Sequence, residues 1–181
     1  IREEKLQGWL FYNMRHRDKV ADRLLDIPET TMNTRPWYYF IPAEGEPVKI
    51  IHLVESSALG HLPGKVRTYF SRDLLTQELS SLPVGKIGVQ YSKEITAISY
   101  LDYGTALLLQ DIGFSLVSSV NLIQRTVGVL TANDIESHEK AAHHLYEIVA
   151  LTWQKIKGYG SSGETLYEGD IHNWINNEFS H

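Results

Sequence analysis

Residues 34–55 read TRPWYYFIPAEGEPVKIIHLVE, which is an apolar aromatic run, a turn and a second apolar run. Its first half, residues 37–41, is aromatic and β-branched, a composition typical of a β-strand. Residues 42–47 then supply two prolines that fix φ and one permissive glycine, Gly45, as a hairpin connection requires. Residues 48–54 are apolar on both faces. They therefore predict a second, central strand that pairs antiparallel with the first.

The first of these strands carries four consecutive aromatic residues, Trp37, Tyr38, Tyr39 and Phe40. Side chains alternate between the two faces of a strand, so these rings cannot all point into one core. Either helices cover both faces of the sheet, or one face meets another subunit. We expect helices to cover most of the four rings.

Strand-like and helix-like segments alternate along the rest of residues 1–129. The predicted strands outside the hairpin are residues 8–12, 65–70, 86–91 and 115–117. The predicted helices are residues 17–25, 71–82, 105–112 and 121–127. Ser71 is placed to cap the second helix, and Gly113 to end the third. This alternation predicts an α/β domain with a mixed sheet.

From residue 130 onward the sequence loses its strand signal. Thr131 or Asn133 can cap a long helix that runs to about Lys157, and residues 158–163 indicate a Gly/Ser-rich connector. A capping box of Thr165 and Glu168 predicts the start of a second helix.

Each of these two helices carries an apolar stripe. The stripes consist of Ala142, Leu145, Val149, Thr152, Trp153 and Ile156 on the first helix, and Tyr167, Ile171, Trp174, Ile175 and Phe179 on the second. Such helices are marginal without a partner surface. They could pair with each other, fold back on the α/β domain, or belong to a second domain.

The composition excludes several classes of protein. The chain has a net charge of −5, 43% hydrophobic residues and no cysteine. The lack of cysteine excludes disulfides, thiolate catalysis and cysteine-based zinc sites. No segment approaches the ~20 apolar residues of a spanning helix, and no basic patch offers the usual footprint of nucleic-acid binding. We therefore expect a cytoplasmic protein that binds neither membrane nor nucleic acid.

A few residues resemble elements of catalytic or metal sites but fit structural roles better. His138, His143 and His144 share one predicted helix at spacings of five and six, whereas a helical zinc pair needs i and i+4. Asp102 precedes a predicted helix, where an aspartate is typically a cap rather than a general base. His52 lies in a predicted strand and is expected to be a hydrogen-bonded structural residue.

Two further patterns carry no chemistry. Residues 158–163 are glycine-rich but contain no lysine and follow no strand, so they do not predict a phosphate loop. Ser56, Ser57, Ser118 and Ser119 have no base pattern near them in the sequence, and nucleophilic serine catalysis is not expected. We therefore assign no catalytic residue and no metal ligand to residues 1–181, and the substrate-binding residues stay unknown.

The hairpin stretch also resembles a family pattern. It follows the TR-x-W-(Y/F)-x-x-IP-x-x-GEP-x-x-x-x-H-x-x-E segment of the N-terminal domain in the Xaa-Pro peptidase (aminopeptidase P and prolidase) and creatinase family. The matching residues are Thr34, Arg35, Trp37, Tyr38, Ile41, Pro42, Gly45, Glu46, Pro47, His52 and Glu55. Tyr91-Ser92, then Asp102 and Gly104, then residues 112–124 follow the family's later elements in the same order.

The resemblance implies a mixed-sheet domain of RNase-H-like topology over residues 1–129. Residues 130–181 would be the first two helices of an incomplete catalytic domain of the pita-bread type. In this family that domain binds two divalent metal ions (Mn, Co or Zn) through Asp, Asp, His, Glu and Glu, and a metal-bridging hydroxide attacks the amide. Nothing in this sequence matches those ligands. The family also implies short proline-containing peptides as substrates and a homodimer, with the N-terminal domain shaping the active-site entrance.

We therefore predict the N-terminal, non-catalytic part of a metal-dependent Xaa-Pro aminopeptidase or dipeptidase, inactive by itself. Two alternatives stay open. One is a creatinase-like amidinohydrolase, which shares the fold but not the metals, and the other is a non-enzymatic binding protein that retains the fold. A nuclease of RNase-H-like fold would need clustered acidic residues on adjacent strands, which the predicted strands do not offer.

Overall fold

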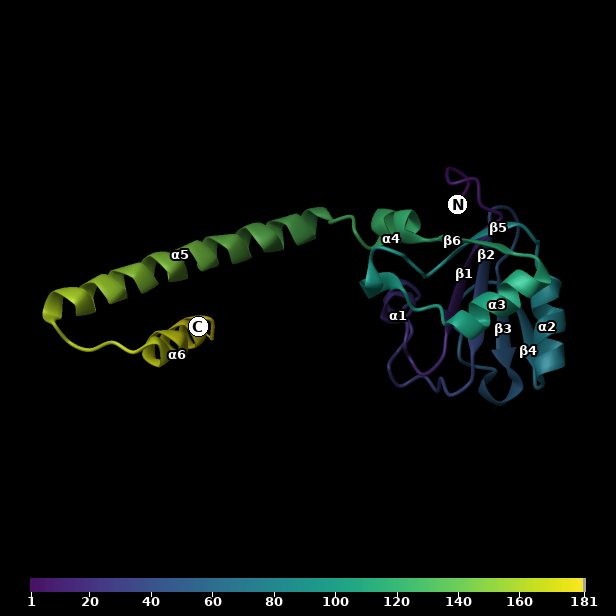
Figure 1. Ribbon diagram of the computed structural model, residues 1–181, viewed down its shortest axis with the longest axis horizontal. Helices are drawn as coiled ribbons and strands as arrows, with labels where there is room; N and C mark the ends of the chain where they lie inside the picture. The colour runs from purple at the N-terminus through teal and green to yellow at the C-terminus, as the bar shows by residue number, and fades with distance from the viewer. Residues whose placement is uncertain (181) are drawn as a thin grey trace. The chain divides into compact units, whose positions relative to one another are not determined.

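The structure is a computed structural model, and it describes residues 1–180. The chain divides into two compact units, Ile1–Val129 and Leu130–His181. Figure 1 labels the helices and strands of each unit.

The first unit is built on one six-stranded mixed sheet in the order β4-β3-β2-β1-β5-β6. The strands are β1 Gly8–Asn13, β2 Trp37–Pro42, β3 Val48–His52, β4 Lys65–Tyr69, β5 Lys86–Val89 and β6 Ser115–Ser118. β2 runs antiparallel to β1 and β3, and the other pairings are parallel. The predicted α/β mixed sheet and its central hairpin are thus confirmed, with Tyr38 opposite Ile50.

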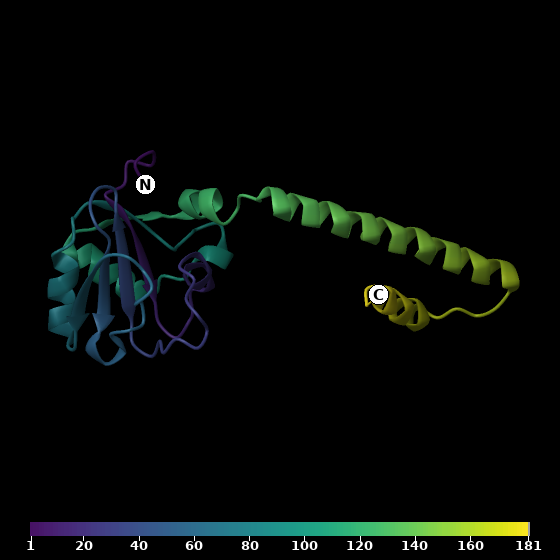
Figure 2. The same ribbon diagram turned by 180° about the vertical axis from the view of Figure 1, so that it is seen from behind.

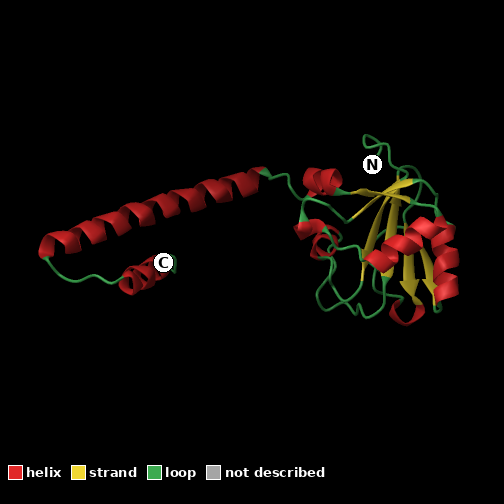
Figure 3. Ribbon diagram, in the orientation of Figure 1, coloured by secondary structure: helices red, strands yellow, loops and turns green. Residues whose placement is uncertain are grey.

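An α-helix follows each of β1, β4, β5 and β6, while β2, β3 and β4 succeed one another without an α-helix between them (Figure 3). The helices of this unit are α1 Lys19–Leu24, α2 Arg72–Ser80, α3 Tyr103–Ile112 and α4 Val120–Thr126, with short 3-10 turns η1 Leu53–Glu55 and η2 Thr96–Ile98. Ser71 Oγ accepts a hydrogen bond from Leu74 N at 3.2 Å and caps α2. Gly113 ends α3 with a left-handed φ of 110°, which a glycine adopts readily.

Three strands are shorter than predicted. The strand predicted at residues 65–70 ends at Tyr69, and the strand predicted at residues 86–91 ends at Val89. The second hairpin strand ends at His52, and Leu53 and Val54 turn into η1 with most of their side-chain surface exposed. Apolar character alone could not locate this end. The turn forms because the His52 side chain accepts from Val54 N at 3.2 Å.

Apolar side chains fill a core on each face of the sheet (Figures 1 and 2 show the unit from opposite sides). Tyr38 and Phe40 pack with residues of α2 and α3 on one face. Trp37 and Tyr39 pack with residues of α1 and α4 on the other face. All four rings are at most 3% exposed. Coverage of both faces, as expected from the alternation along β2, is confirmed.

The second unit contains two helices, α5 Ala132–Ser162 and α6 Glu168–Glu178. Thr131 caps α5 in a reciprocal capping box with Asp134. The predicted connector at residues 158–163 is wrong, because α5 continues through Gly158 and Gly160 and ends at Gly163, which has a left-handed φ of 73°. The predicted capping box is wrong as well: α6 begins at Glu168, and Asp170 accepts from Tyr167 N at 3.3 Å.

Both helices of this unit leave apolar side chains open to solvent. Trp153 is 66% exposed and Phe179 is 58% exposed, and Ile148 is the buried residue of α5. No residue of α6 is fully buried, and Ile171, Trp174 and Ile175 on its apolar stripe are partly buried. Within residues 1–180, no helix has the length and apolar character that crossing a membrane requires.

Candidate functional site

Five of the six strands of the first unit end along the same border of the sheet, the carboxyl edge. Because β2 alone runs in the opposite direction, β1, β3, β4, β5 and β6 all point their carboxyl ends to this edge. After β4 the chain crosses through α2 to β5, on the other side of β1, so the strand order reverses there. Open α/β sheets bind ligands outside the carboxyl ends of their strands at such a reversal. We take this carboxyl edge as the candidate site.

Three tyrosines line the α2 and α3 side of the carboxyl edge. Tyr12 on β1 lies opposite Tyr38 on β2, with ring centroids 5.3 Å apart. Tyr69 on β4 lies opposite His52, whose ring meets it edge-on at 5.1 Å. The Tyr69 hydroxyl donates to the Pro36 carbonyl oxygen at 2.5 Å.

Burial determines the protonation of these tyrosines. It raises the pKa of Tyr12 and of Tyr38 above the ordinary value, and it raises the pKa of Tyr69 to about 12. All three hydroxyls therefore keep their protons at neutral pH. They can donate hydrogen bonds, but they cannot act as bases.

Asp102 also lies at the carboxyl edge, where it is the N-cap residue of α3. Its Oδ1 accepts from Thr105 N at 2.9 Å, and its Oδ2 accepts from Thr105 Oγ1 at 2.8 Å. Burial by itself would raise the pKa of Asp102, but the hydrogen bonds from Thr105 and Tyr12 and the charge of Arg17 hold it below the ordinary value. The prediction of a cap is confirmed. Because its lowered pKa makes the carboxylate a weak base and both of its oxygens already accept hydrogen bonds, Asp102 is a poor general base.

A second carboxylate, that of Glu55, fixes the chain just before β2. Glu55 is 5% exposed and accepts hydrogen bonds from Thr34 N (2.9 Å), Arg35 N (3.2 Å) and the Thr34 hydroxyl. Burial works to raise its pKa, but these bonds and the charge of Arg35 lower it below the ordinary value. Glu55 is part of the sequence pattern, but the pattern does not reveal this role. The hydrogen-bond partners of Glu55 lie about twenty positions away in the sequence.

The outer rim of the carboxyl edge is apolar. Leu53 and Phe70 follow paired ends of β3 and β4, since His52 lies opposite Tyr69. Both side chains are more than half exposed, as are those of Met32, Val54 and Tyr103. Leu53 and Phe70 thus leave apolar surface at paired strand ends open to contact with another molecule.

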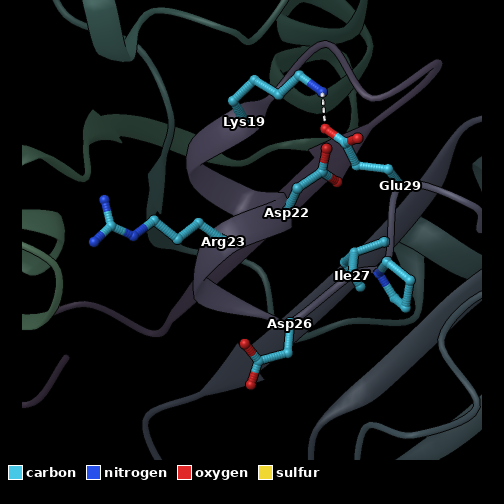
Figure 4. Close-up of a pocket in the computed structure, with 7 residues that line it drawn as sticks. Lys19, Asp22, Arg23, Asp26, Ile27 and Glu29 are labelled. Carbon is cyan, nitrogen blue, oxygen red and sulfur yellow. Dashed lines mark ion pairs between the residues drawn. The ribbon is translucent and has the colours of Figure 1, made fainter. Parts of the chain in front are cut away.

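A pocket of about 530 Å³ lies beside the N-terminal residues and α4, with Trp9, Leu122 and Arg125 in its lining. Two more pockets lie in this unit outside the tyrosine row. One of about 310 Å³ adjoins the edge beside the start of α3, and Tyr91, Leu101, Tyr103 and Leu116 contribute to its walls. The other, of about 420 Å³, lies between α1 and the loop that follows (Figure 4).

The pocket beside α1 has mixed charge and an open shape. Lys19 pairs with Glu29 at 3.7 Å across it, and Asp22, Arg23 and Asp26 complete the charged lining (Figure 4). Both side chains of the ion pair are more than 60% exposed, so solvent screens the pair. This surface therefore offers no pre-formed binding group.

Several buried polar atoms follow the carboxyl ends of strands and have no hydrogen-bond partner. They are Asp18 Oδ2 after β1, both amide atoms of Gln90 after β5, and Ser119 Oγ after β6. Each residue is at most 2% exposed. Burial raises the pKa of Asp18 to about 6, against the hydrogen bonds that its other oxygen accepts as the cap of α1.

The histidines considered as zinc ligands lie apart from this edge in the sequence, on α5. His138 Nδ1 lies 2.7 Å from the Asp134 carbonyl oxygen, and His143 and His144 lie 3.3 and 3.5 Å from the carboxylate of Glu147. Across the described residues, no three histidine, aspartate or glutamate side chains come together as a metal site. The side chains present therefore do not fit the two-metal centre that the family resemblance implies.

Of the serines considered as nucleophiles, Ser56 and Ser118 have structural roles. Ser56 caps the C-terminal end of η1, and Ser118 Oγ donates to the Tyr91 carbonyl oxygen at 2.5 Å. Residues 158–162 are helical, so they do not form a phosphate loop.

Comparison with known proteins identifies the fold. The sequence matches no protein-family model, and no curated protein matches it. Among solved structures, a proline dipeptidase from Streptococcus pneumoniae TIGR4 superposes with a TM-score of 0.54 at 15% identity, over 71% of this chain and 92% of that chain. The creatinase/prolidase N-terminal domain of an X-Pro dipeptidase from Streptococcus pyogenes gives 0.51 at 11% identity, over 68% and 89%.

A longer match extends across the second unit. The prolidase from Pyrococcus horikoshii OT3 has a TM-score of 0.52 at 13% identity, covering 99% of this chain but 45% of that chain. This chain thus spans less than half the length of that prolidase. At these identities the likeness shows the fold, a mixed α/β sheet like that of creatinase/prolidase N-terminal domains.

Proposed function

We propose that this chain is the N-terminal part of a metal-dependent Xaa-Pro peptidase. In this proposal residues 1–129 form a non-catalytic domain, and residues 130–181 are the leading helices of the catalytic domain. The observation that carries the proposal is the extent of the fold likeness, which runs through 99% of this chain along the Pyrococcus prolidase.

The second unit supports the same division. Its two helices expose large apolar side chains, among them Tyr146, Trp153 and Phe179. Amphipathic helices gain most of their stability from packing, so these faces suit a protein in which further structure covers them. A longer chain would supply that structure.

The carboxyl edge is the part of the domain best suited to shape an entrance. Its exposed apolar side chains, such as Phe70 and Tyr103, can contact an extended peptide. Tyr38 and Tyr69 are buried and do not reach it. We propose that this edge adjoins the opening through which short proline-containing peptides reach the catalytic centre. In a homodimer, the carboxyl edge would lie against a second subunit.

The proposal is tested by assaying two proteins with an Xaa-Pro dipeptide in the presence of Mn²⁺. The chain of residues 1–181 should give no turnover. The longer protein encoded by the same gene should release proline and should leave the matched Xaa-Ala dipeptide intact.

Each other outcome has a defined meaning. Turnover by residues 1–181 alone would refute the assignment of the chemistry to another part of the protein. Metal-independent hydrolysis of creatine by the longer protein would instead favour the amidinohydrolase. Inactivity on both substrates would favour the binding protein.

A further inference from the structure

His16 holds two parts of the first unit at once. Its Nδ1 lies 3.0 Å from Asp22 Oδ2 on α1, and its Nε2 lies 2.8 Å from the carbonyl oxygen of Thr31, in the loop between α1 and β2. A carbonyl oxygen and an ionised carboxylate only accept hydrogen bonds, and a neutral imidazole carries a single N–H. Both bonds can therefore exist together only while the His16 ring carries two protons.

The backbone at this position is unusual and is tied to the same loop. Arg15 and His16 both have left-handed φ values, 57° and 52°, which residues with side chains adopt only where the surroundings enforce them. Arg15 N donates to the Asn33 carbonyl oxygen at 2.7 Å. With the Asn33 amide assigned so that Nδ2 donates to the Arg35 carbonyl oxygen, its Oδ1 accepts from His16 N at 3.2 Å. The loop is thus held at Thr31 and at Asn33 by one short segment.

Polar and charged groups from β1 and α1 surround the contact between His16 and Asp22. Asn13 Nδ2, on β1, donates to Asp22 Oδ1 at 2.9 Å, and Asn13 Oδ1 accepts from Asp18 N at 3.1 Å. Asp22 also faces the pocket whose other charged groups are Lys19, Arg23, Asp26 and Glu29. Burial raises the pKa of Asp18 to about 6, so a test must separate Asp18 from His16.

We propose that His16 is a proton-dependent anchor for the loop between α1 and β2. With two ring protons, His16 ties Thr31 to Asp22. Without the second proton it keeps one of the two bonds, and the loop separates from α1 near Thr31. The loop leads directly into Thr34 and Arg35, which Glu55 holds at the carboxyl edge. A change of pH that removes the second ring proton would thus alter the mobility of one wall of the candidate site. The inference does not depend on the peptidase proposal.

The test is amide hydrogen exchange of the full chain between pH 5.5 and 8.5, corrected for the intrinsic pH dependence of exchange and resolved at residues 29–35. In the natural protein, protection of these amides should fall roughly tenfold as pH rises, since one hydrogen bond to a charged group is lost. Protection in β2 should stay constant. Equal protection of residues 29–35 at both pH values would overturn the proposal.

Three variants locate the effect. His16→Asn suits a left-handed φ but does not titrate, so its loop should exchange fast at every pH. His16→Arg supplies permanent donors and should stay protected at pH 8.5. Asp18→Asn keeps the cap of α1 and removes the other titrating group, so the pH effect should persist. If Asp18→Asn abolishes the effect and His16→Asn preserves it, Asp18 is the sensor and the proposal is wrong. His138→Asn, on α5, is the matched control and should change nothing in residues 29–35.

Discussion

The two units of this chain differ in how far their apolar side chains are buried. In Ile1–Val129, even four consecutive aromatic residues are buried, because helices cover both faces of the sheet. In Leu130–His181, residues of equal size such as Trp153 and Phe179 stay more than half exposed. The first unit therefore has its own hydrophobic cores, while the second has helices with little to pack against. Sequence periodicity alone identifies amphipathic helices, but it does not identify the surface that buries them.

The sharpest test of this contrast is a matched pair of leucine truncations. Leu79 is fully buried between α2 and the sheet, and Leu145 on α5 is 48% exposed. We expect Leu79→Ala to lower the free energy of unfolding by about 3 kcal/mol, because it leaves a cavity. Leu145→Ala should change it by less than about 0.5 kcal/mol. Urea unfolding followed by circular dichroism measures both, and equal effects would contradict the contrast.

The next largest effect concerns a buried charge. The pKa of Asp18 is raised to about 6 in the folded chain, above its unfolded value of 3.8. The folded state then binds the proton more tightly, so the stability contributed by this group is full below about pH 4 and is lost as pH rises to about 6. Asp18→Asn keeps the cap and should raise the unfolding free energy by roughly 2 kcal/mol at pH 7.5. The gain should vanish near pH 4, and a pH-independent gain would show that burial of the charge is not its cause.

The third prediction compares the stabilising effect of Glu55, a buried glutamate at the carboxyl edge, with that of Glu136, an exposed glutamate of the second unit. Glu55→Gln removes the charge that holds Thr34 and Arg35, and it should cost about 1–2 kcal/mol at pH 7. Since the pKa of Glu55 is lowered, this stabilisation is present above the unfolded pKa and declines as the pH falls through the folded one. Glu136→Gln breaks an exposed i,i+4 pair with Lys140 and should cost less than about 0.5 kcal/mol. Thermal unfolding of both variants at pH 7 and pH 3 checks the difference.

The smallest expected effect is that of removing the second unit. Every residue of the two buried cores lies before residue 130. A chain ending at Val129 should therefore unfold cooperatively, with a free energy within about 0.5 kcal/mol of that of the full chain. A loss of more than about 1 kcal/mol would mean that the first unit is not self-sufficient.

Most of the first unit could be predicted from its sequence because local signals agree there. The aromatic run, the two prolines around Gly45, the Ser71 cap and the Gly113 terminus each mark an element that the structure contains. The end of β3 could not be predicted, because Leu53 and Val54 look like strand residues but turn away into η1.

The errors in the second unit have a different cause. Gly158 and Gly160 each cost a helix about 1 kcal/mol, which made a connector the natural prediction. The helix nevertheless continues until Gly163 supplies a left-handed C-cap. At the candidate site, the roles of His16 and Glu55 depend on partners fifteen and about twenty positions away. No local pattern in a single sequence encodes such contacts.

Amide hydrogen exchange over the whole chain tests the contrast between the units most directly. We predict that the amides of β1, β2 and β3 exchange only through global unfolding, whereas those of α5 and α6 exchange through local opening with at least about 100-fold lower protection. If α5 were as protected as β2 in the same sample, the second unit would have a core of its own, and its proposed need for further structure would be wrong.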